Sequence, residues 1–309
     1  MTFSIDCNLD QEALWLGQPL KKEARVRATF VSLLLPVLAP PGEVTLHVLE
    51  PSQLVPPIET AAATVREVQP PHPATANLRW ADPAAKHVND RRFALELGLA
   101  LPGTQTFRSL EQLERILATE QPGKWVAKAP WSAAGRSRIH GVDNAIKHDD
   151  RIALPRLLAF AGELVYEPWM NRQFDLAVCG TVGDSVELLP PHTLLSGPNG
   201  SFHGIDLTPP ALEAAELDQL LLAAERAGHL LQAHGYRGPF GIDAFVYSTM
   251  HGRQIHPLCE INARHTFGHV AHAFHRRFGY TKLHINNAMP PTGHPLASID
   301  HRVIAWSMV

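Results

Sequence analysis

Two strand-like segments in the C-terminal third of this chain constrain its fold more than any other feature. The first, GYRGPFGIDAFVY, covers residues 235–247, and the second, HPLCEINARHTFG, covers residues 256–268. Each carries one acidic residue among apolar neighbours, Asp243 in the first segment and Glu260 in the second. The apolar neighbours predict two half-buried strands, and a half-buried acid needs a cation or a hydrogen-bond partner.

Alternation along a strand places Glu260 and Asn262 on the same face, and a hairpin would bring Asp243 to that face as well. Two carboxylates and an amide oxygen suit Mg²⁺ carried by a nucleotide phosphate, with Mn²⁺ as an alternative. Arg264, two residues further, is placed to meet a phosphate or an anionic intermediate. Cys259 is expected on the opposite face as a small core residue. The competing interpretation is three separate polar residues on edge strands.

A second candidate group follows the apolar strand KWVAKA. Lys128 lies inside this strand, where a buried ammonium group needs an anionic partner such as a nucleotide phosphate. The small residues from Ser132 to Gly135 would let backbone N–H groups approach phosphate oxygens, and Arg136 and Arg138 follow them. The alternative for Lys128 is a strand end that faces water, and the Walker pattern GxxxxGK[ST] is absent.

In chain order from about residue 85 to residue 280, these segments resemble the ATP-grasp superfamily. The DAFV strand followed by EINAR resembles its metal-binding end, and KWVAKAPWSAAGRSRIHG resembles its strand, nucleotide-contacting lysine and phosphate loop. LVYEPWMNRQFDLAV resembles its adenine-binding hinge followed by an acidic residue. NDRRFALELGLALP, residues 89–102, resembles the helix that opens its first lobe.

The resemblance implies roles for further residues. Asp175 takes the place of the glutamate that usually holds the ribose hydroxyls. Arg91 and Arg92 fall where the family often carries a lysine that reaches the phosphates, and of the two we select Arg92. The alternative for Asp175 is a strand carboxylate that faces water. The alternative for Arg91 and Arg92 is an exposed basic helix start. Three residues would frame the adenine: Glu167, Trp169 and Met170.

The expected fold is therefore α/β, with two ATP-grasp lobes that clasp the nucleotide and a small α/β domain before them. We expect the N-terminal domain over residues 1–80, the first lobe over 81–166, and the second lobe with the metal site over 167–309. The proline-rich stretch from residue 69 to residue 83 is the candidate for the first boundary. Residues 26–38 could form a helix or a buried strand.

Further helices are indicated by their capping residues. Residues 109–120 predict a helix with Ser109 as N-cap and Gln112 as capping-box partner. A long amphipathic helix is expected after Thr208, its predicted N-cap. The closing helix, residues 265–279, carries four histidines that favour a structural role over a metal site, because no HExxH pattern is present. They are His265, His269, His272 and His275.

Composition excludes several classes of partner. The 309 residues carry a formal net charge of −3, which gives no general attraction toward nucleic acid or an anionic membrane. The longest apolar run, residues 31–39, is too short to cross a bilayer and contains a proline. The N-terminal residues lack the basic region of a secretory signal, and Cys7, Cys179 and Cys259 lack zinc-ligand spacing. We therefore expect reduced thiols and a cytoplasmic protein.

For function, the resemblance implies an ATP-dependent carboxylate–amine ligase. A substrate carboxylate would attack the γ-phosphate to give an acyl phosphate and ADP, and an amine would then displace phosphate. Positioning and cations supply the rate, so no side-chain nucleophile is needed. A kinase-like phosphotransferase and a non-catalytic ATP-binding regulator remain as alternatives, although the full set from Asp243 to Arg264 argues against the regulator. The acid and the amine are unreadable, and a homodimer is expected by analogy alone.

Overall fold

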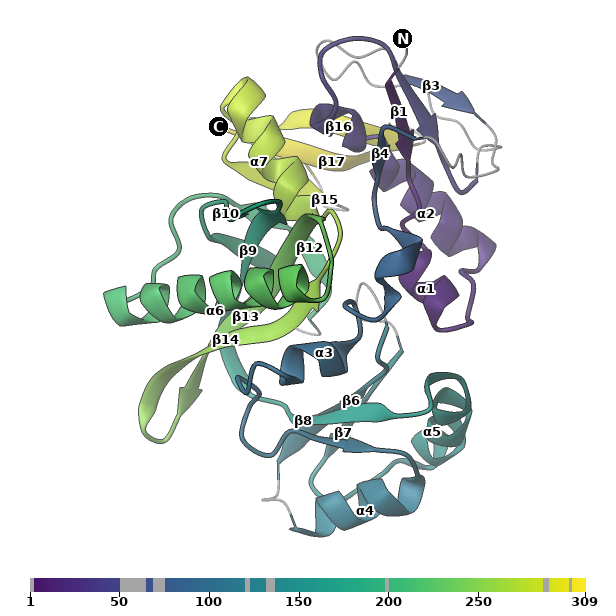
Figure 1. The fold of residues 1–309 in the computed structure, drawn as a ribbon, viewed down its shortest axis with the longest axis vertical. Coiled ribbons are helices and arrows are strands. Elements are labelled where there is room, and N and C mark those ends of the chain that lie inside the picture. Colours follow the sequence, from purple (N-terminus) through teal and green to yellow (C-terminus); the bar gives the residue numbers. More distant parts are fainter. Residues whose placement is uncertain are drawn as a thin grey trace.

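The computed structural model describes residues 3–50, 65–68, 76–119, 123–131, 137–197, 200–285, 289–299 and 302–309. Within them the chain forms three sheets: an N-terminal one, a small one and a large one. Figure 1 shows the N-terminal unit at the upper right, the small sheet with its helices at the bottom, and the large sheet at the left and centre. The three sheets follow one another along the chain in the same order as the three predicted domains, whose boundaries remain predictions.

The N-terminal sheet is parallel and has the order β3–β2–β1–β4. Its strands are β1 (Phe3–Asp6), β2 (Val44–His47), β3 (Val65–Val68) and β4 (Leu78–Arg79). Its helical elements are α1 (Gln11–Trp15), α2 (Lys22–Ser32) and the 3₁₀ turn η1 (Leu35–Leu38). The segment that could have been a helix or a strand is thus helical, and the 3₁₀ turn forms around Pro36, which cannot continue an α-helical hydrogen-bond ladder.

The small sheet is antiparallel and has the order β5–β8–β6–β7. Its elements are β5 (Gln105–Phe107), α4 (Leu110–Thr119), β6 (Lys124–Lys128), β7 (Arg138–Val142), α5 (His148–Ala161) and β8 (Leu164–Pro168). The predicted N-cap of α4 is confirmed, because the Gln112 N–H donates to Ser109 Oγ over 3.2 Å. The Gln112 side chain does not close the capping box on Ser109, since its Oε1 accepts from the N–H of Arg108.

The large sheet has the order β14–β13–β9–β11–β12–β15–β17–β16, and β10 pairs with β9. Its first strands are β9 (Asn171–Val182), β10 (Val186–Leu188), β11 (His192–Ser196), β12 (Phe202–Asp206) and β13 (Gly238–Thr249). The others are β14 (Gly252–Asn262), β15 (Lys282–Ile285), β16 (His294–Ile299) and β17 (Arg302–Met308). Helix α6 (Ala214–Ala233) runs across β9, β13 and β14, and α7 (Phe267–Phe278) packs near β9 and β12 (Figure 1).

Two expected helix boundaries are wrong. Thr208 does not cap α6, because its N–H and hydroxyl both donate to Asp206 in a local turn, and the helix begins only after Glu213. The helix expected over residues 89–102 is the single short α3 (Arg91–Leu95), and Gly98 follows with a φ of 66°. A positive φ cannot continue a right-handed helix, so the apolar spacing beyond Leu95 is not helical.

Buried side chains join the parts of the molecule. One core unites the N-terminal sheet with α7 and the last strands of the large sheet. A second lies between α6 and the large sheet and includes Phe93 and Ala94 of α3. A third fills the small sheet and takes in Leu16 from the N-terminal unit. Helix α3 packs on β14 and lies between the small and large sheets, so charged residues at its start reach the junction of the two (Figure 1).

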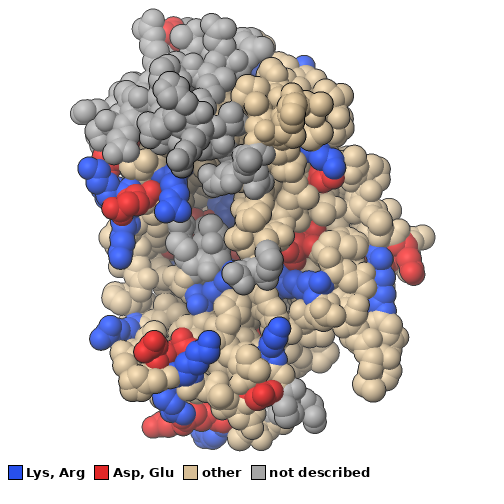
Figure 2. All heavy atoms as spheres, turned by 180° about the vertical axis from the view of Figure 1, so that it is seen from behind, with Lys and Arg blue, Asp and Glu red and all other residues tan. Residues whose placement is uncertain are grey.

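Figure 2 shows basic and acidic side chains next to one another at several places on the rear face. No helix in the described part of the chain is both long enough and apolar enough to span a membrane.

Candidate functional site

The hairpin β13–β14 brings together the three predicted metal-binding residues. The strands pair antiparallel, as expected, with Asp243 directly opposite Glu260. Asn262 lies two residues beyond Glu260, and its Nδ2 donates to Asp243 Oδ2 over 3.4 Å. Two carboxylates and one amide therefore meet on one face at the end of the hairpin. Their role as metal ligands remains a prediction.

The electrostatics of this group favour a cation. Burial and the neighbouring charge of Glu260 together raise the pKa of Asp243 to about 7, while Arg264 opposes the change. No three His, Cys, Asp or Glu side chains in the described residues are grouped to hold a metal on their own. Asp243 and Glu260 with the Asn262 amide still fit Mg²⁺ or Mn²⁺, because Mg²⁺ commonly takes one or two protein carboxylates and completes its shell with phosphates and water.

Of the two arginines that open α3, only Arg91 points into the site. Its Nη1 lies 2.5 Å from Glu260 Oε2, and its Nε donates to the carbonyl of Ala129 over 3.0 Å. Arg92 is held elsewhere by Asp90, the N-cap of α3, and by Glu163 at 2.8 Å. The structure therefore does not bring Arg92 to the other predicted residues, and the neighbouring Arg91 occupies that position.

Lys128 has an anionic partner within the protein. Its Nζ lies 2.5 Å from Glu167 Oε2, and both side chains are about nine-tenths buried. The partners come from adjacent antiparallel strands, β6 and β8. Burial alone would raise the pKa of Glu167, but Lys128 and Arg91 hold that pKa below its usual value. A buried ammonium is thus satisfied by a carboxylate at the base of the predicted nucleotide site.

The expectation that Cys259 faces away from the site is wrong. Its Sγ lies 3.9 Å from Lys128 Nζ, toward the small sheet. The cause is a β-bulge, because Asp243 pairs with Glu260 whereas Phe245 pairs with His256, which leaves two extra residues on β14. A bulge interrupts the simple alternation of faces. Burial raises the pKa of the Cys259 thiol, so it is not activated as a nucleophile.

The predicted hinge lies where β8 passes into β9. The N–H of Trp169 donates to the carbonyl of Lys124 over 2.8 Å, so this donor is used by the sheet. The Trp169 ring contacts His140 edge-on with centroids 4.6 Å apart, and the guanidinium of Arg172 lies 4.9 Å from its centroid. Met170 accepts a backbone hydrogen bond from Arg172. The adenine-framing role of this segment remains a prediction.

Asp175 pairs with Arg172, an arginine that no sequence motif had marked. Arg172 Nη1 donates to Asp175 Oδ1 over 2.9 Å, and the same guanidinium lies 4.0 Å from the Phe245 ring centroid. Asp175 lies on β9 opposite Phe245, within two residues of the row that holds Asp243. The ribose role proposed for it is untested. Ser132, Gly135 and Arg136 lie outside the described residues.

Positive charges converge on the site from both sides. Burial lowers the pKa of Arg138, and the nearby charges of Arg172 and Arg91 lower it further. Burial also lowers the pKa of His140, with added repulsion from Arg138 and Lys128. Such mutual repulsion arises only where cationic groups lie close together. A polyanion placed among them would relieve it.

Arg264 lies beside the predicted metal ligands, and its guanidinium donates three hydrogen bonds within the protein. Its Nη2 donates to Asn262 Oδ1 over 2.8 Å, and its Nη1 donates to the carbonyl of His265 over 3.0 Å. Its Nε donates to the carboxylate of Glu12 in α1. Because Glu12 lies 252 positions away, no local sequence pattern could have identified it.

The four histidines near α7 favour the structural interpretation. His265 precedes the helix, which starts at Phe267, so only three of the four are helical. One ring nitrogen of each histidine lies 3.0–3.2 Å from a backbone carbonyl, and these carbonyls belong to Arg79, Gly180, Pro190 and Tyr280. The other ring nitrogen of His269, Nδ1, accepts from the N–H of Thr266 over 3.1 Å.

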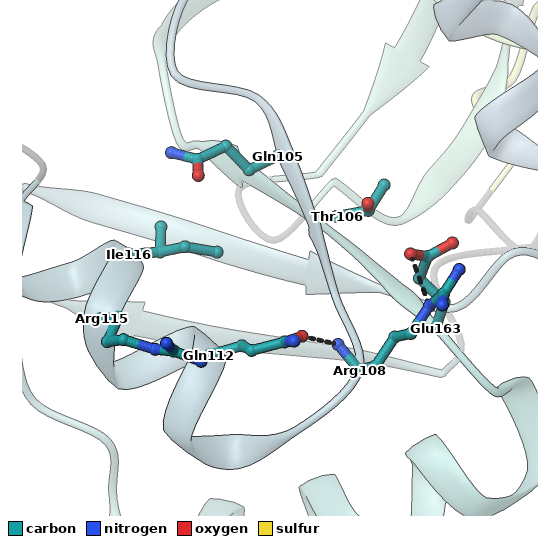
Figure 3. A pocket seen from close by; sticks show the side chains of 7 residues that line it. All are labelled: Gln105, Thr106, Arg108, Gln112, Arg115, Ile116 and Glu163. Atoms are coloured by element: carbon teal, nitrogen blue, oxygen red, sulfur yellow. Dashed lines mark hydrogen bonds and ion pairs between the residues drawn. The ribbon is translucent and has the colours of Figure 1, made fainter.

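A surface hollow of about 410 Å³ lies elsewhere, on the small sheet. Figure 3 shows that its walls come from β5, α4 and the two residues Arg108 and Glu163, which form an ion pair at 3.1 Å. None of the residues predicted to bind nucleotide or metal lines it. The hollow is therefore separate from the candidate site.

Comparisons with known proteins give the following similarities. No family model matches the chain. A curated relative, the butirosin acyl-carrier protein–L-glutamate ligase of Niallia circulans, is 28% identical over 159 residues, which are 51% of this chain and 37% of the relative. The match thus spans well under half of that relative's length.

Solved structures match over the whole chain. N5-carboxyaminoimidazole synthetase from Staphylococcus aureus, complexed with ADP, aligns with a TM-score of 0.58 and 11% identity over 100% of this chain and 94% of that one. An ATP-grasp superfamily protein from Archaeoglobus fulgidus aligns with a TM-score of 0.53 and 14% identity over 100% of both chains. At these identities the likeness is one of fold.

Proposed function

We propose that this chain, which has the ATP-grasp fold, is an ATP-dependent carboxylate–amine ligase. It would form an amide or peptide-like bond through an acyl phosphate and release ADP and phosphate. One observation carries the proposal: Asp243, Glu260 and Asn262 bring oxygen atoms together on the large sheet, where Arg91 pairs with Glu260 and Lys128 reaches the adjacent Cys259. Oxygen ligands for a metal beside cations for phosphates suit a metal–ATP complex.

Each residue has a defined task in this proposal. Lys128, Arg91 and Arg138 hold the phosphates, together with the loop that includes Ser132, Gly135 and Arg136. Trp169 and Met170 frame the adenine, and Asp175 holds the ribose. Mg²⁺ or Mn²⁺ held by Asp243, Glu260 and Asn262 would neutralise charge on the phosphates. Arg264 opposes the negative charge of the acyl phosphate and of the tetrahedral species formed by the amine.

The relatives support this reaction class. The name of the Niallia circulans relative describes a ligase acting on L-glutamate and an acyl-carrier protein, and the Staphylococcus aureus neighbour was solved with ADP. Because its name includes L-glutamate and a carrier protein, these are the first substrates to test. The match covers only part of that ligase, so its substrates are not assigned to this chain.

The test is product analysis with purified protein, ATP and MgCl₂. Carboxylic acids and amines are supplied in pairs, beginning with L-glutamate and acyl-carrier protein, and ADP, free phosphate and amide are measured. A ligase yields all three, and ¹⁸O from the acid should appear in the released phosphate. A phosphorylated product without free phosphate would establish the kinase instead. ATP binding without turnover of any pair would favour the regulator.

A further inference from the structure

The N-terminal unit reaches the candidate site through one buried ion pair. Glu12 of α1 accepts from Nε of Arg264, and the two side chains are only 7% and 12% exposed. The contact joins the start of the chain to the end of the hairpin that carries Asp243 and Glu260. Within the described residues, Glu12 is the acidic partner of Arg264.

The backbone strengthens this junction. Ala81, just after β4, forms an isolated bridge with Arg264, and the N–H of His265 donates to the carbonyl of Trp80 over 2.9 Å. The Trp80 ring centroid lies 5.8 Å from the Arg264 guanidinium carbon. The N-terminal unit therefore contacts both the main chain and the side chain of Arg264.

The hydrogen bonds orient the guanidinium. An arginine has five N–H donors, and in the described residues Glu12, the His265 carbonyl and Asn262 accept from three of them. The second N–H on each terminal nitrogen has no hydrogen-bond acceptor within that part of the chain. Because Nε donates to Glu12, only the two terminal nitrogens can donate to a bound anion. The anion would then lie at the end of the guanidinium, beside the Asn262 amide.

We infer that Glu12 is a positioning residue for Arg264, so that the N-terminal unit completes the active site of the large lobe. The inference rests on the proposed ligase function, in which Arg264 meets the acyl phosphate. Glu12 does not touch the substrate in this scheme. It holds the guanidinium in the orientation that presents two N–H groups to a two-oxygen anion.

The kinetic test compares Glu12→Gln with a matched control, another helical glutamate that pairs with an arginine. Arg253, at the other end of β14, pairs with Glu216 of α6 at 2.7 Å, so Glu216→Gln removes an equivalent carboxylate far from the site. Misplacement of a reacting group by about 1 Å can cost about 100-fold in rate. We expect Glu12→Gln to lower kcat by about that factor with an unchanged KM for ATP, and Glu216→Gln to leave kcat unchanged.

Glu12→Asp keeps the charge on a shorter side chain and should restore part of the lost kcat. Wild-type kcat in Glu12→Gln would overturn the positioning role. So would an equal loss in Glu216→Gln, because the effect would then be a general loss of stability.

A second measurement is independent of turnover. Urea unfolding of Glu12→Gln, Arg264→Gln and the double variant tests the pair itself. The double variant should unfold at a urea concentration no lower than that of either single variant, since each single change leaves a buried charge without its partner and the double change leaves none. Additive shifts of the midpoint would show that the pair is not formed, whatever the reaction is. Absence of turnover in the wild type, with a coupled pair, would instead overturn the ligase proposal.

Discussion

One face of the large sheet contains two regions of buried ionisable groups. The groups are neutral in one region and form charged pairs in the other. Glu260, Asp243, Ala177 and His192 lie opposite one another across β14, β13, β9 and β11, and so form one row. One end of the row meets α3 and the small sheet, and the other end lies under α7. The two ends can therefore be compared within a single face.

Under α7 the groups are neutral. Burial lowers the pKa of His192 and of His269 to about 3 and that of His272 to about 4, and it raises the pKa of the Cys179 thiol to about 12. Backbone carbonyls satisfy the rings of His269 and His272. The rings of His269 and His272 therefore act as polar packing, which requires no ligand.

At the other end the groups stay charged in pairs, Lys128 with Glu167 and Arg91 with Glu260. Asp243 is the exception, with its pKa raised to about 7. Retaining charge in a buried place is costly unless it is compensated. Of the two ends, the one that faces the small sheet is therefore arranged for a charged ligand.

The largest expected effect comes from Glu260→Gln at the charged end. Loss of this carboxylate removes one of the two anionic groups that would hold the metal, and with it several kcal/mol of the stabilisation that the metal would give the phosphates, so turnover should fall by about 10³-fold or more. Phosphate release in the ligase assay measures it, with circular dichroism to verify the fold. Near-normal turnover would contradict the proposed difference between the two ends, because the charged end would then not bind the metal and ATP.

Lys128→Met should affect both stability and ATP affinity. Leaving Glu167 buried without its partner costs about 3–5 kcal/mol of unfolding free energy. The double variant Lys128→Met/Glu167→Gln should recover most of that stability, yet bind ATP about 10- to 100-fold more weakly than the wild type, since a charge-assisted contact is lost. Urea unfolding and calorimetric titration separate the two. If the double variant regained ATP affinity as well, Lys128 would be purely structural.

The neutral end predicts a dependence of stability on pH. Histidines in the unfolded chain take up protons below about pH 6.5, whereas His192, His269 and His272 stay neutral until about pH 3–4. The unfolded state thus binds more protons, and the free energy of unfolding should fall as pH drops from 6.5 toward 4. The limiting slope is about 1.4 kcal/mol per pH unit for each histidine.

Urea unfolding between pH 7.5 and 4.5 measures this slope, and His272→Asn should reduce it. The exposed His229 of α6 is the matched control, and His229→Asn should leave the slope unchanged. A flat profile would mean that the buried histidines gain protons without unfolding.

The smallest effect is expected at the surface hollow in Figure 3. Arg108 is 72% exposed where it meets Glu163, and an exposed ion pair contributes about 0.5 kcal/mol or less. Arg108→Ala should change neither the unfolding midpoint nor ATP affinity measurably. A large loss of ATP affinity in this variant would show that ATP binds at the hollow. It would contradict the proposal that ATP binds at the charged end of the row.

Local pattern alone was enough to find the heart of the candidate site. Asp243, Glu260 and Asn262 lie on two neighbouring strands, where alternation and hairpin pairing determine which side chains share a face. Lys128 was identifiable because an ammonium inside an apolar strand demands a partner. The ATP-grasp fold was predictable from the order of four such segments.

Tertiary structure decided everything that depends on distant contacts. Arg91 faces the site and Arg92 does not, because the N-cap Asp90 and Glu163 draw Arg92 away. The bulge in β14 turned Cys259 toward Lys128 against the simple alternation.

The clearest case is Glu12, which meets Arg264 across 252 positions. Periodicity reports only which face of its own strand or helix a residue occupies. Which charges then meet across separate elements depends on how those elements pack, and that information is not contained in any local segment.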